Sequence, residues 1–257
     1  MTQYFDTHAH YDSGKFNADR ADVLRAVHES GVALIVDPGD CAATSERAVA
    51  IAQEYDFVYA AVGWHPEEAA GWTDDSLDQI RALAAQPKVC AIGEIGLDYY
   101  WDTSTKATQE TMLRAQLELA LELDLPVIIH DREAHGDSLR IVCDYPGLRG
   151  VFHCFSGSVE MAEELLKLGW MLSFNGAITF KNARKAPEVI AAVPLERMMV
   201  ETDAPYLTPV PFRGKRNDSG YVHLVAEKIA QLKGLPAEQV ERQTWENGVR
   251  FFGIPQE

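Results

Sequence analysis

Short apolar runs rich in β-branched residues alternate along the chain with longer segments whose apolar positions recur at helical spacing. Near-continuous apolar runs of this kind are typical of strands that are buried on both faces of a parallel sheet. The pattern predicts eight strands, which are Gln3–Thr7, Val32–Asp37, Phe57–Gly63, Val89–Gly93, Pro126–His130, Gly150–Phe155, Met171–Asn175 and Met198–Asp203.

The segments between these runs are amphipathic. Leucine and alanine recur at i, i+4, i+7 and i+8 over residues 113–121, and apolar residues follow i, i+3, i+4 and i+7 over residues 222–229. Gly31, Gly169 and Gly234 stand where such helices would end, as C-cap glycines often do.

Eight strands that alternate with helices over 257 residues predict an α/β fold, a single (β/α)8 TIM barrel formed by one domain over residues 1–257. A doubly wound open sheet is the alternative. It is disfavoured because no Gly-x-Gly-x-x-Gly follows the first run and no P-loop is present.

Composition and charge narrow the class of protein. Apolar residues make up 47% of the chain, no apolar run reaches membrane-spanning length, and the first residues lack a signal-peptide pattern. Four cysteines without paired spacing are typical of free thiols in a reducing compartment, so we expect a cytoplasmic protein with no membrane contact. The net charge of −16 argues against a protein that coats nucleic acid, although salt screening leaves room for a local basic patch.

Histidine and acidic residues recur where the predicted strands end. In this fold the chemistry takes place at the C-terminal ends of the strands, where barrel closure brings separate segments together. Each residue alone could be a buried histidine satisfied by the backbone or a carboxylate in an ion pair. Their recurrence at several strand ends predicts a metal centre; the residues are His8, His10, His65, Glu94, His130, His153, Glu201 and Asp203.

The number of ligands predicts more than one ion. A single catalytic zinc-type ion needs only about three protein ligands, so a larger set suggests two divalent cations roughly 3.5–4 Å apart. Glu94 is then a natural bridging carboxylate. This mixture of imidazoles and carboxylates does not distinguish Mg²⁺, Mn²⁺ and Zn²⁺. The predicted ligands are His8, His10, Glu94, His130, His153 and Asp203.

Six motifs in order make the whole chain resemble the TatD family of metal-dependent deoxyribonucleases, in the amidohydrolase superfamily. They are "FDTHAHYD", "GWHP", "GEIGLDYY", "PVIIHDR", "FHCFSG" and "VETDAPYLTPVPFRGKRN". The resemblance implies that one ion is held by His8, His10, Glu94 and Asp203, and the other by Glu94, His130 and His153. It also implies catalytic roles for His65 and Glu201, and an activity that cleaves nucleic-acid phosphodiesters, often from a 3′ end.

Basic residues gather after the predicted strands that often bind phosphate in barrels, the seventh and the eighth. Arginine and lysine suit phosphate oxygens, although a solvated loop is the alternative for each of them and is favoured for Lys185. The phosphate-binding candidates are Arg132, Lys181, Arg213, Lys215 and Arg216, with Arg184 also left open. Rings in Asp98–Trp101 and at Tyr206 could stack on exposed bases, or could simply pack within their loops.

Together these patterns predict a monomeric 3′–5′ exodeoxyribonuclease that acts on single-stranded ends of DNA or RNA. Two cations would activate a water whose proton Asp203 accepts, and His65 would contact the phosphate or protonate the leaving oxygen. One alternative is a hydrolase of the same superfamily that acts on a small phosphoester, a cyclic amide or an aminoacyl ester. Glu94 stands where cyclic-amide hydrolases of that superfamily carry a modified lysine, which favours the nuclease. A non-catalytic metal-binding barrel is the least favoured alternative.

Overall fold

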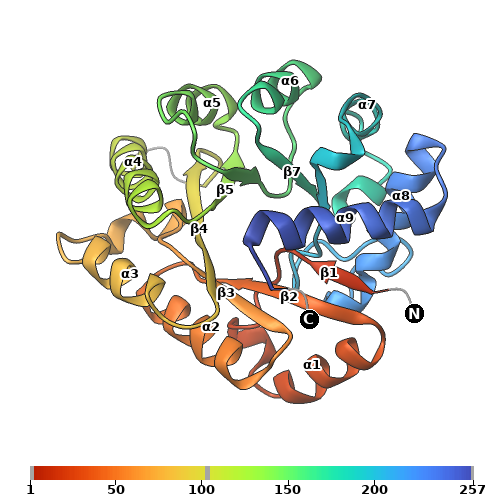
Figure 1. Ribbon diagram of the computed structural model, residues 1–257, viewed down its shortest axis with the longest axis horizontal. Coiled ribbons are helices and arrows are strands. Elements are labelled where there is room, and N and C mark those ends of the chain that lie inside the picture. The colour runs from red at the N-terminus through yellow and green to blue at the C-terminus, as the bar shows by residue number, and fades with distance from the viewer. Residues whose placement is uncertain (1–2, 102–104, 256–257) are drawn as a thin grey trace.

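Eight parallel strands form one sheet that curves into a nearly closed barrel with helices around it (Figure 1). The structure is a computed structural model and describes residues 3–101 and 105–255. Each strand pairs in parallel with the next along the chain. The strands are β1 (Tyr4–Asp6), β2 (Val32–Pro38), β3 (Val58–Val62), β4 (Val89–Asp98), β5 (Val127–Arg132), β6 (Gly150–Phe152), β7 (Met171–Phe174) and β8 (Met198–Val200). The predicted barrel is confirmed.

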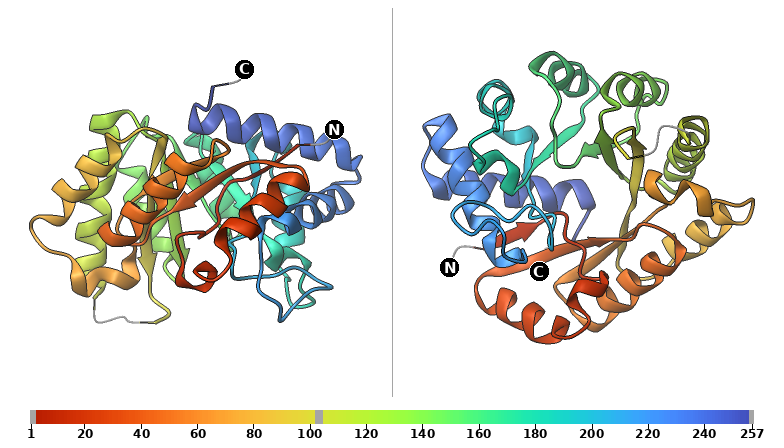
Figure 2. Two further views of the ribbon diagram at one scale, coloured as in Figure 1. Left: turned by 90° about the horizontal axis from the view of Figure 1, so that it is seen from below. Right: turned by 180° about the vertical axis from the view of Figure 1, so that it is seen from behind.

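The helices form the outer layer, as both views of Figure 2 show. They are α1 (Arg20–Glu29), α2 (Ala42–Glu54), α3 (Ser76–Ala84), α4 (Lys106–Leu123), α5 (His135–Cys143), α6 (Val159–Lys167), α7 (Ala186–Ala192), α8 (Val222–Lys233) and α9 (Ala237–Phe252). Short 3-10 turns lie between them at Gly14–Phe16, Pro66–Gly71, Gly176–Thr179, Leu195–Arg197 and Ser219–Tyr221. In the described residues, no helix combines the length and the apolar character needed to span a bilayer.

Two apolar clusters divide the core. Alternate residues of the strands belong to a cluster shared with the surrounding helices, and the intervening residues, such as Phe5 and Val36, form a second cluster inside the barrel. Phe251 and Phe252 of α9 join this inner cluster, and the ring of Phe252 lies 5.8 Å from that of Phe5. Helix α9 therefore closes the N-terminal end of the barrel, which leaves the opposite end for polar residues.

Prediction and structure differ at the seam between β1 and β8. Strand β8 ends at Val200, before the predicted end at Asp203, and Asp203 itself adopts a left-handed backbone with φ of 57°. Single backbone hydrogen bonds continue the seam beyond the strands: Thr7 N donates to Val200 O at 3.2 Å and Asp203 N donates to His8 O at 2.9 Å. Leaving the regular strand turns Asp203 beside the residues that follow β1.

Strand β4 runs to Asp98, five residues beyond its predicted end at Gly93. Gly96 permits this extension because its φ is +148° and a Cβ there would lie 1.9 Å from the carbonyl oxygen of His130. Only glycine allows β4 to approach β5 this closely. The extension brings Glu94 and Asp98, on the same strand, into contact with His130.

Candidate metal centre

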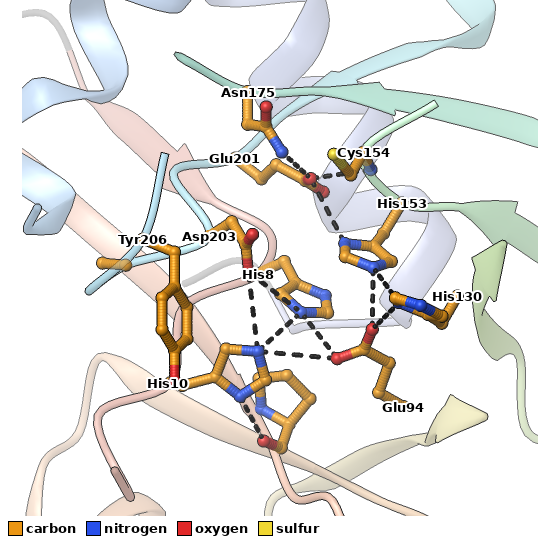
Figure 3. A network of polar contacts seen from close by, with 12 residues as sticks. His8, His10, Glu94, His130, His153, Cys154, Asn175, Glu201, Asp203 and Tyr206 are labelled. Carbon is orange, nitrogen blue, oxygen red and sulfur yellow. Dashed lines mark hydrogen bonds and ion pairs between the residues drawn. The ribbon is translucent and has the colours of Figure 1, made fainter. Parts of the chain in front are cut away.

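Glu94 lies at the middle of a buried group of histidines at the C-terminal end of the barrel (Figure 3). Its Oε2 is 3.2 Å from His8 Nε2 and 3.5 Å from His10 Nε2. Its Oε1 is 2.9 Å from His130 Nδ1 and 2.7 Å from His153 Nε2. Burial raises the pKa of Glu94, but the surrounding histidines outweigh it and bring that pKa well below its usual value. Glu94 is therefore an ionised carboxylate with one oxygen toward each pair of histidines.

The first side of this group consists of His8, His10 and Asp203. The Nε2 atoms of the two histidines are 3.2 Å apart, and Asp203 Oδ1 lies 3.9 Å from the first and 3.6 Å from the second. His10 Nδ1 is 3.1 Å from the carbonyl oxygen of Pro38, which can only accept a hydrogen bond. Nδ1 must then carry a proton, which leaves Nε2 of His10 as the atom that would bind a cation between Glu94 and Asp203 once its own proton is lost. Burial lowers the pKa of His10, but Asp203, Asp40 and Glu94 outweigh it and raise that pKa well above its usual value.

The second side consists of His130 and His153, each with a carboxylate on the ring nitrogen opposite Glu94. His130 Nε2 is 3.0 Å from Asp98 Oδ2, and His153 Nδ1 is 3.4 Å from Glu201 Oε1. Burial disfavours the charged form of His130, but hydrogen bonds to Asp98 and Glu94 outweigh it and raise the pKa of His130 to about 9. A carboxylate behind a ligating histidine fixes the ring and increases its basicity toward a metal. These donor sets fit divalent cations.

The structure places Glu201 behind His153, as Figure 3 shows. Its Oε1 accepts hydrogen bonds from Cys154 N at 2.8 Å and Asn175 Nδ2 at 3.0 Å, and its side chain is fully buried. These are the contacts of a residue that orients a ligand. Glu201 also forms, with His8 and His153, one of the clusters that could hold a metal ion. Its catalytic role stays a prediction.

His65 lies on the second side of Glu94, with Nε2 3.5 Å from Glu94 Oε1. Its Nδ1 accepts a hydrogen bond from Glu67 N at 3.2 Å. Because Nδ1 accepts, the proton of the neutral ring is on Nε2, which makes His65 a hydrogen-bond donor directed at the centre. A donor in this position can contact a phosphate oxygen or a leaving oxygen.

Among the predicted phosphate-binding residues, Arg216 has a protein partner. Its guanidinium forms hydrogen bonds of 2.9 and 2.7 Å with the two carboxylate oxygens of Asp19 and one of 2.9 Å with Lys15 O. This bidentate pair joins the loop after β8 to the start of α1. Arg216 therefore supports the loop after β8, and its assignment to phosphate stays a prediction.

The other basic residues lie over aromatic rings or in solvent. Arg213 is 3.9 Å from the ring centre of Phe180, and Lys215 is 5.3 Å from that of Phe212. Lys181 follows the 3-10 turn Gly176–Thr179 and is exposed. Arg132 at the end of β5 covers the ring of Tyr100. Their assignment to phosphate stays a prediction.

A cavity of about 560 Å³ adjoins the centre and lies among the loops after β5, β6 and β7. Cys154 and Asn175, which hold Glu201, form part of its wall. Arg184 and Lys185 line it as well. His135 begins α5, pairs with Asp131 at 2.7 Å and also lines this cavity.

Three positioning groups were missed in the sequence: Asp98, Asn175 and the carbonyl of Pro38. The only sequence signal for Asp98 was that it follows Glu94 in "GEIGLDYY" at a strand end. A backbone carbonyl leaves no signal in the sequence, because every residue carries one.

Comparison with known proteins decides the family. The sequence profile described as "TatD related DNase" matches residues 5–253. The chain belongs to this family. It is 46% identical over 252 residues to the uncharacterized metal-dependent hydrolase YabD of Bacillus subtilis, with 97% of this chain and 99% of that protein covered. It is 34% identical to the 3′-5′ ssDNA/RNA exonuclease TatD of Cronobacter sakazakii, with 96% and 97% covered.

Among solved structures, the TatD homologue YjjV of Escherichia coli superposes with a TM-score of 0.93 at 34% identity and covers 99% of both chains. The resemblance inferred from the six motifs is thereby confirmed. The protein is a TatD-family metal-dependent hydrolase with histidine and carboxylate clusters able to bind metal.

Proposed function

We propose that this hydrolase is a nuclease that removes nucleotides from the 3′ ends of single-stranded DNA or RNA with two divalent cations. The observation that supports it best is Glu94, whose two oxygens face two separate sets of histidines. Paired cations are a common solution for phosphodiester hydrolysis, because they hold the attacking and the leaving oxygens at once. The relative from Cronobacter sakazakii carries the name of such an exonuclease.

His8, His10, Glu94 and Asp203 would hold one cation, and Glu94, His130 and His153 the other. When bound, such ions neutralise phosphate charge and lower the pKa of a water molecule toward neutrality. The chain itself keeps the ligands in place, because Pro38 O, Asp98 and Glu201 each fix one histidine ring.

Asp203 is suited to accept the proton of the attacking water. Its side chain is 14% exposed, whereas those of Glu94 and Glu201 are 4% and 0% exposed. It is thus the carboxylate of the centre that a substrate can approach. His65 would donate its Nε2 proton to a phosphate or leaving oxygen, and Arg132, Lys181, Arg213 and Lys215 would contact further phosphates.

The test is a 5′-labelled single-stranded DNA oligomer incubated with Mg²⁺, Mn²⁺, Zn²⁺ or EDTA, in parallel with an Asp203→Ala variant. We expect a ladder that shortens from the 3′ end, and EDTA and the substitution should each abolish it. The matched RNA strand tests whether both nucleic acids are substrates. Full cleavage in EDTA, or intact strands with every metal, would refute the nuclease.

One observation favours a second candidate. The cavity of about 560 Å³ beside the centre is large enough for a compact substrate, and it has both basic and apolar walls. A small phosphoester or an aminoacyl ester would then be the substrate. Metal-dependent turnover of such an ester with no cleavage of either nucleic acid would favour this candidate.

A further inference from the structure

Tyr100 and Trp101 are unusually exposed for rings so close to the centre. Their exposed fractions, 55% and 63%, are the largest of any large apolar side chain in the described residues. The two rings are perpendicular with centres 4.8 Å apart. The guanidinium carbon of Arg132 lies 4.0 Å from the centre of the Tyr100 ring and 5.3 Å from that of Trp101. We call these three residues the aromatic platform.

The platform is attached to the metal centre through one buried carboxylate. Asp98 Oδ1 accepts hydrogen bonds from the backbone N–H groups of Tyr100 at 2.8 Å and Trp101 at 3.2 Å. Its Oδ2 lies 3.0 Å from His130 Nε2. A single side chain, 1% exposed, therefore sets both the ring of a predicted metal ligand and the backbone that carries the platform.

Asp98 is itself held in place from α4. Gln109 Oε1 accepts from Asp98 N at 3.0 Å, and Gln109 Nε2 donates to Asp98 O at 3.0 Å. On the other side, Asp98 is the register partner of Arg132 in the β4–β5 pair, so the third member of the platform comes from the adjacent strand. The exposed rings thus stand on backbone that is fixed from two elements.

We propose that the aromatic platform stacks an unpaired base of the substrate next to the phosphate held at the metal centre. This proposal rests on the proposed nuclease function and adds the reason for single-stranded substrates. Aromatic rings and arginine planes stack on any base, without sequence preference. A base within a duplex has both faces covered by its neighbours, so the platform is available only to a single strand or a frayed end. Arg132 also supplies positive charge on a chain of net charge −16.

The experiment combines a protein change with a substrate change. Steady-state kcat/KM is measured with Mn²⁺ on a single strand of normal bases and on the same strand with abasic sites in place of its last three 3′ nucleotides. Trp101→Ala should lower kcat/KM on the normal strand by about 5- to 100-fold, mainly through KM, because a stacked base is lost. The kcat/KM of wild type should be lower by a similar factor on the abasic strand than on the normal strand. The kcat/KM of Trp101→Ala should be nearly the same on the two strands.

Two further variants separate stacking from other effects. Trp101→Phe keeps a ring and should recover most of the activity on the normal strand. Leu121→Ala removes an apolar side chain that is 43% exposed, on the far part of α4, and should match wild type on both strands. Because Trp101 is so exposed, its substitution should leave the melting temperature unchanged, which a thermal scan checks.

The experiment distinguishes a wrong proposal for the aromatic platform from a wrong proposal for the nuclease function. If wild type cleaves single strands but Trp101→Ala loses the same factor on normal and abasic strands, the platform is wrong and the nuclease stands. If Trp101→Ala matches wild type on both strands, the platform is likewise wrong. If wild type cleaves no nucleic acid with any metal, the proposed nuclease function is wrong. The proposal for the aromatic platform depends on that function and is then wrong as well.

Discussion

The two sides of Glu94 differ in where their nearest carboxylates lie, although Asp12 and Asp40 also stand behind His10, each 3.9 Å from its Nδ1. On the side of His130 and His153, the carboxylates of Asp98 and Glu201 lie behind the rings and are almost inaccessible, with 1% and 0% of their side chains exposed. On the side of His8 and His10, the carboxylate of Asp203 lies in front of the rings and is 14% exposed.

This difference separates two tasks. Carboxylates behind the rings are shielded from a substrate, so we expect them to orient ligands and increase their basicity. Asp203 can both bind a cation and accept a proton from the attacking water molecule. We therefore expect the His130–His153 side to hold its cation more firmly and the His8–His10 side to carry the proton transfer.

Removing the group that both sides share should have the largest effect. Glu94→Gln takes away the carboxylate whose two oxygens face the two pairs of histidines. We expect loss of nearly all bound metal, and an activity loss greater than the roughly 100-fold that is typical for residues behind a ligand. Metal content by elemental analysis checks this, with Glu68→Gln, an exposed acid near the same end of the barrel, as the control. Full metal content in Glu94→Gln would show that metal binding does not depend on Glu94. The comparison between the His8–His10 side and the His130–His153 side would then be wrong.

Comparing Asp98→Asn with Asp203→Asn distinguishes the two uses of a carboxylate. Asp98→Asn should weaken metal affinity by about 10- to 100-fold, so excess metal should restore much of its activity. Asp203→Asn should stay inactive at any metal concentration, because the proton acceptor is missing. Activity measured over a metal titration checks both variants. Recovery of Asp203→Asn in excess metal would show that it acts as a ligand alone.

The ligands could be predicted from the sequence better than the groups behind them. Parallel strands in a barrel end on the same face, so His8, Glu94 and His153 could be placed together from strand ends alone. The contact of Asp98 with His130 depends on the close approach of β4 and β5 at Gly96, which no spacing rule gives. The pair of Arg216 with Asp19 was missed for a similar reason, since the two residues lie 197 positions apart in the sequence.

The His8–His10 side should respond to pH through Asp6, a fully buried carboxylate on β1. Asp6 accepts hydrogen bonds from Thr202 N at 2.8 Å and Thr202 Oγ1 at 2.5 Å, which joins β1 to the segment after β8. Burial raises the pKa of Asp6 to about 7 despite these donors. Because the folded state holds the proton more tightly than the unfolded state, the free energy of unfolding should fall as the pH rises through about 7 and level off above that.

For the metal-free protein in EDTA, this group alone should lower the free energy of unfolding by about 1 kcal/mol between pH 6 and pH 8. The corresponding decrease in melting temperature is about 2–4 °C. Asp6→Asn should show a smaller decrease, and the histidines with raised pKa, such as His130, should supply the remainder in both proteins. Thermal scans at the two pH values measure it. Equal slopes in the two proteins would mean that Asp6 does not change its ionisation between the two pH values.

The smallest effect should come from Arg216, on the rim of the same side. Its pair with Asp19 is more than a third exposed on both partners, and exposed pairs contribute roughly 0.2–1 kcal/mol. Arg216→Ala should therefore lower the melting temperature by no more than about 2–4 °C and change kcat/KM on single-stranded DNA less than twofold. Arg213→Ala is the matched comparison, because that guanidinium lies over a ring and has no acidic partner in the described residues. A larger increase in KM for Arg216→Ala than for Arg213→Ala would support phosphate binding by Arg216. Its pair with Asp19 would then be a contact that the substrate displaces.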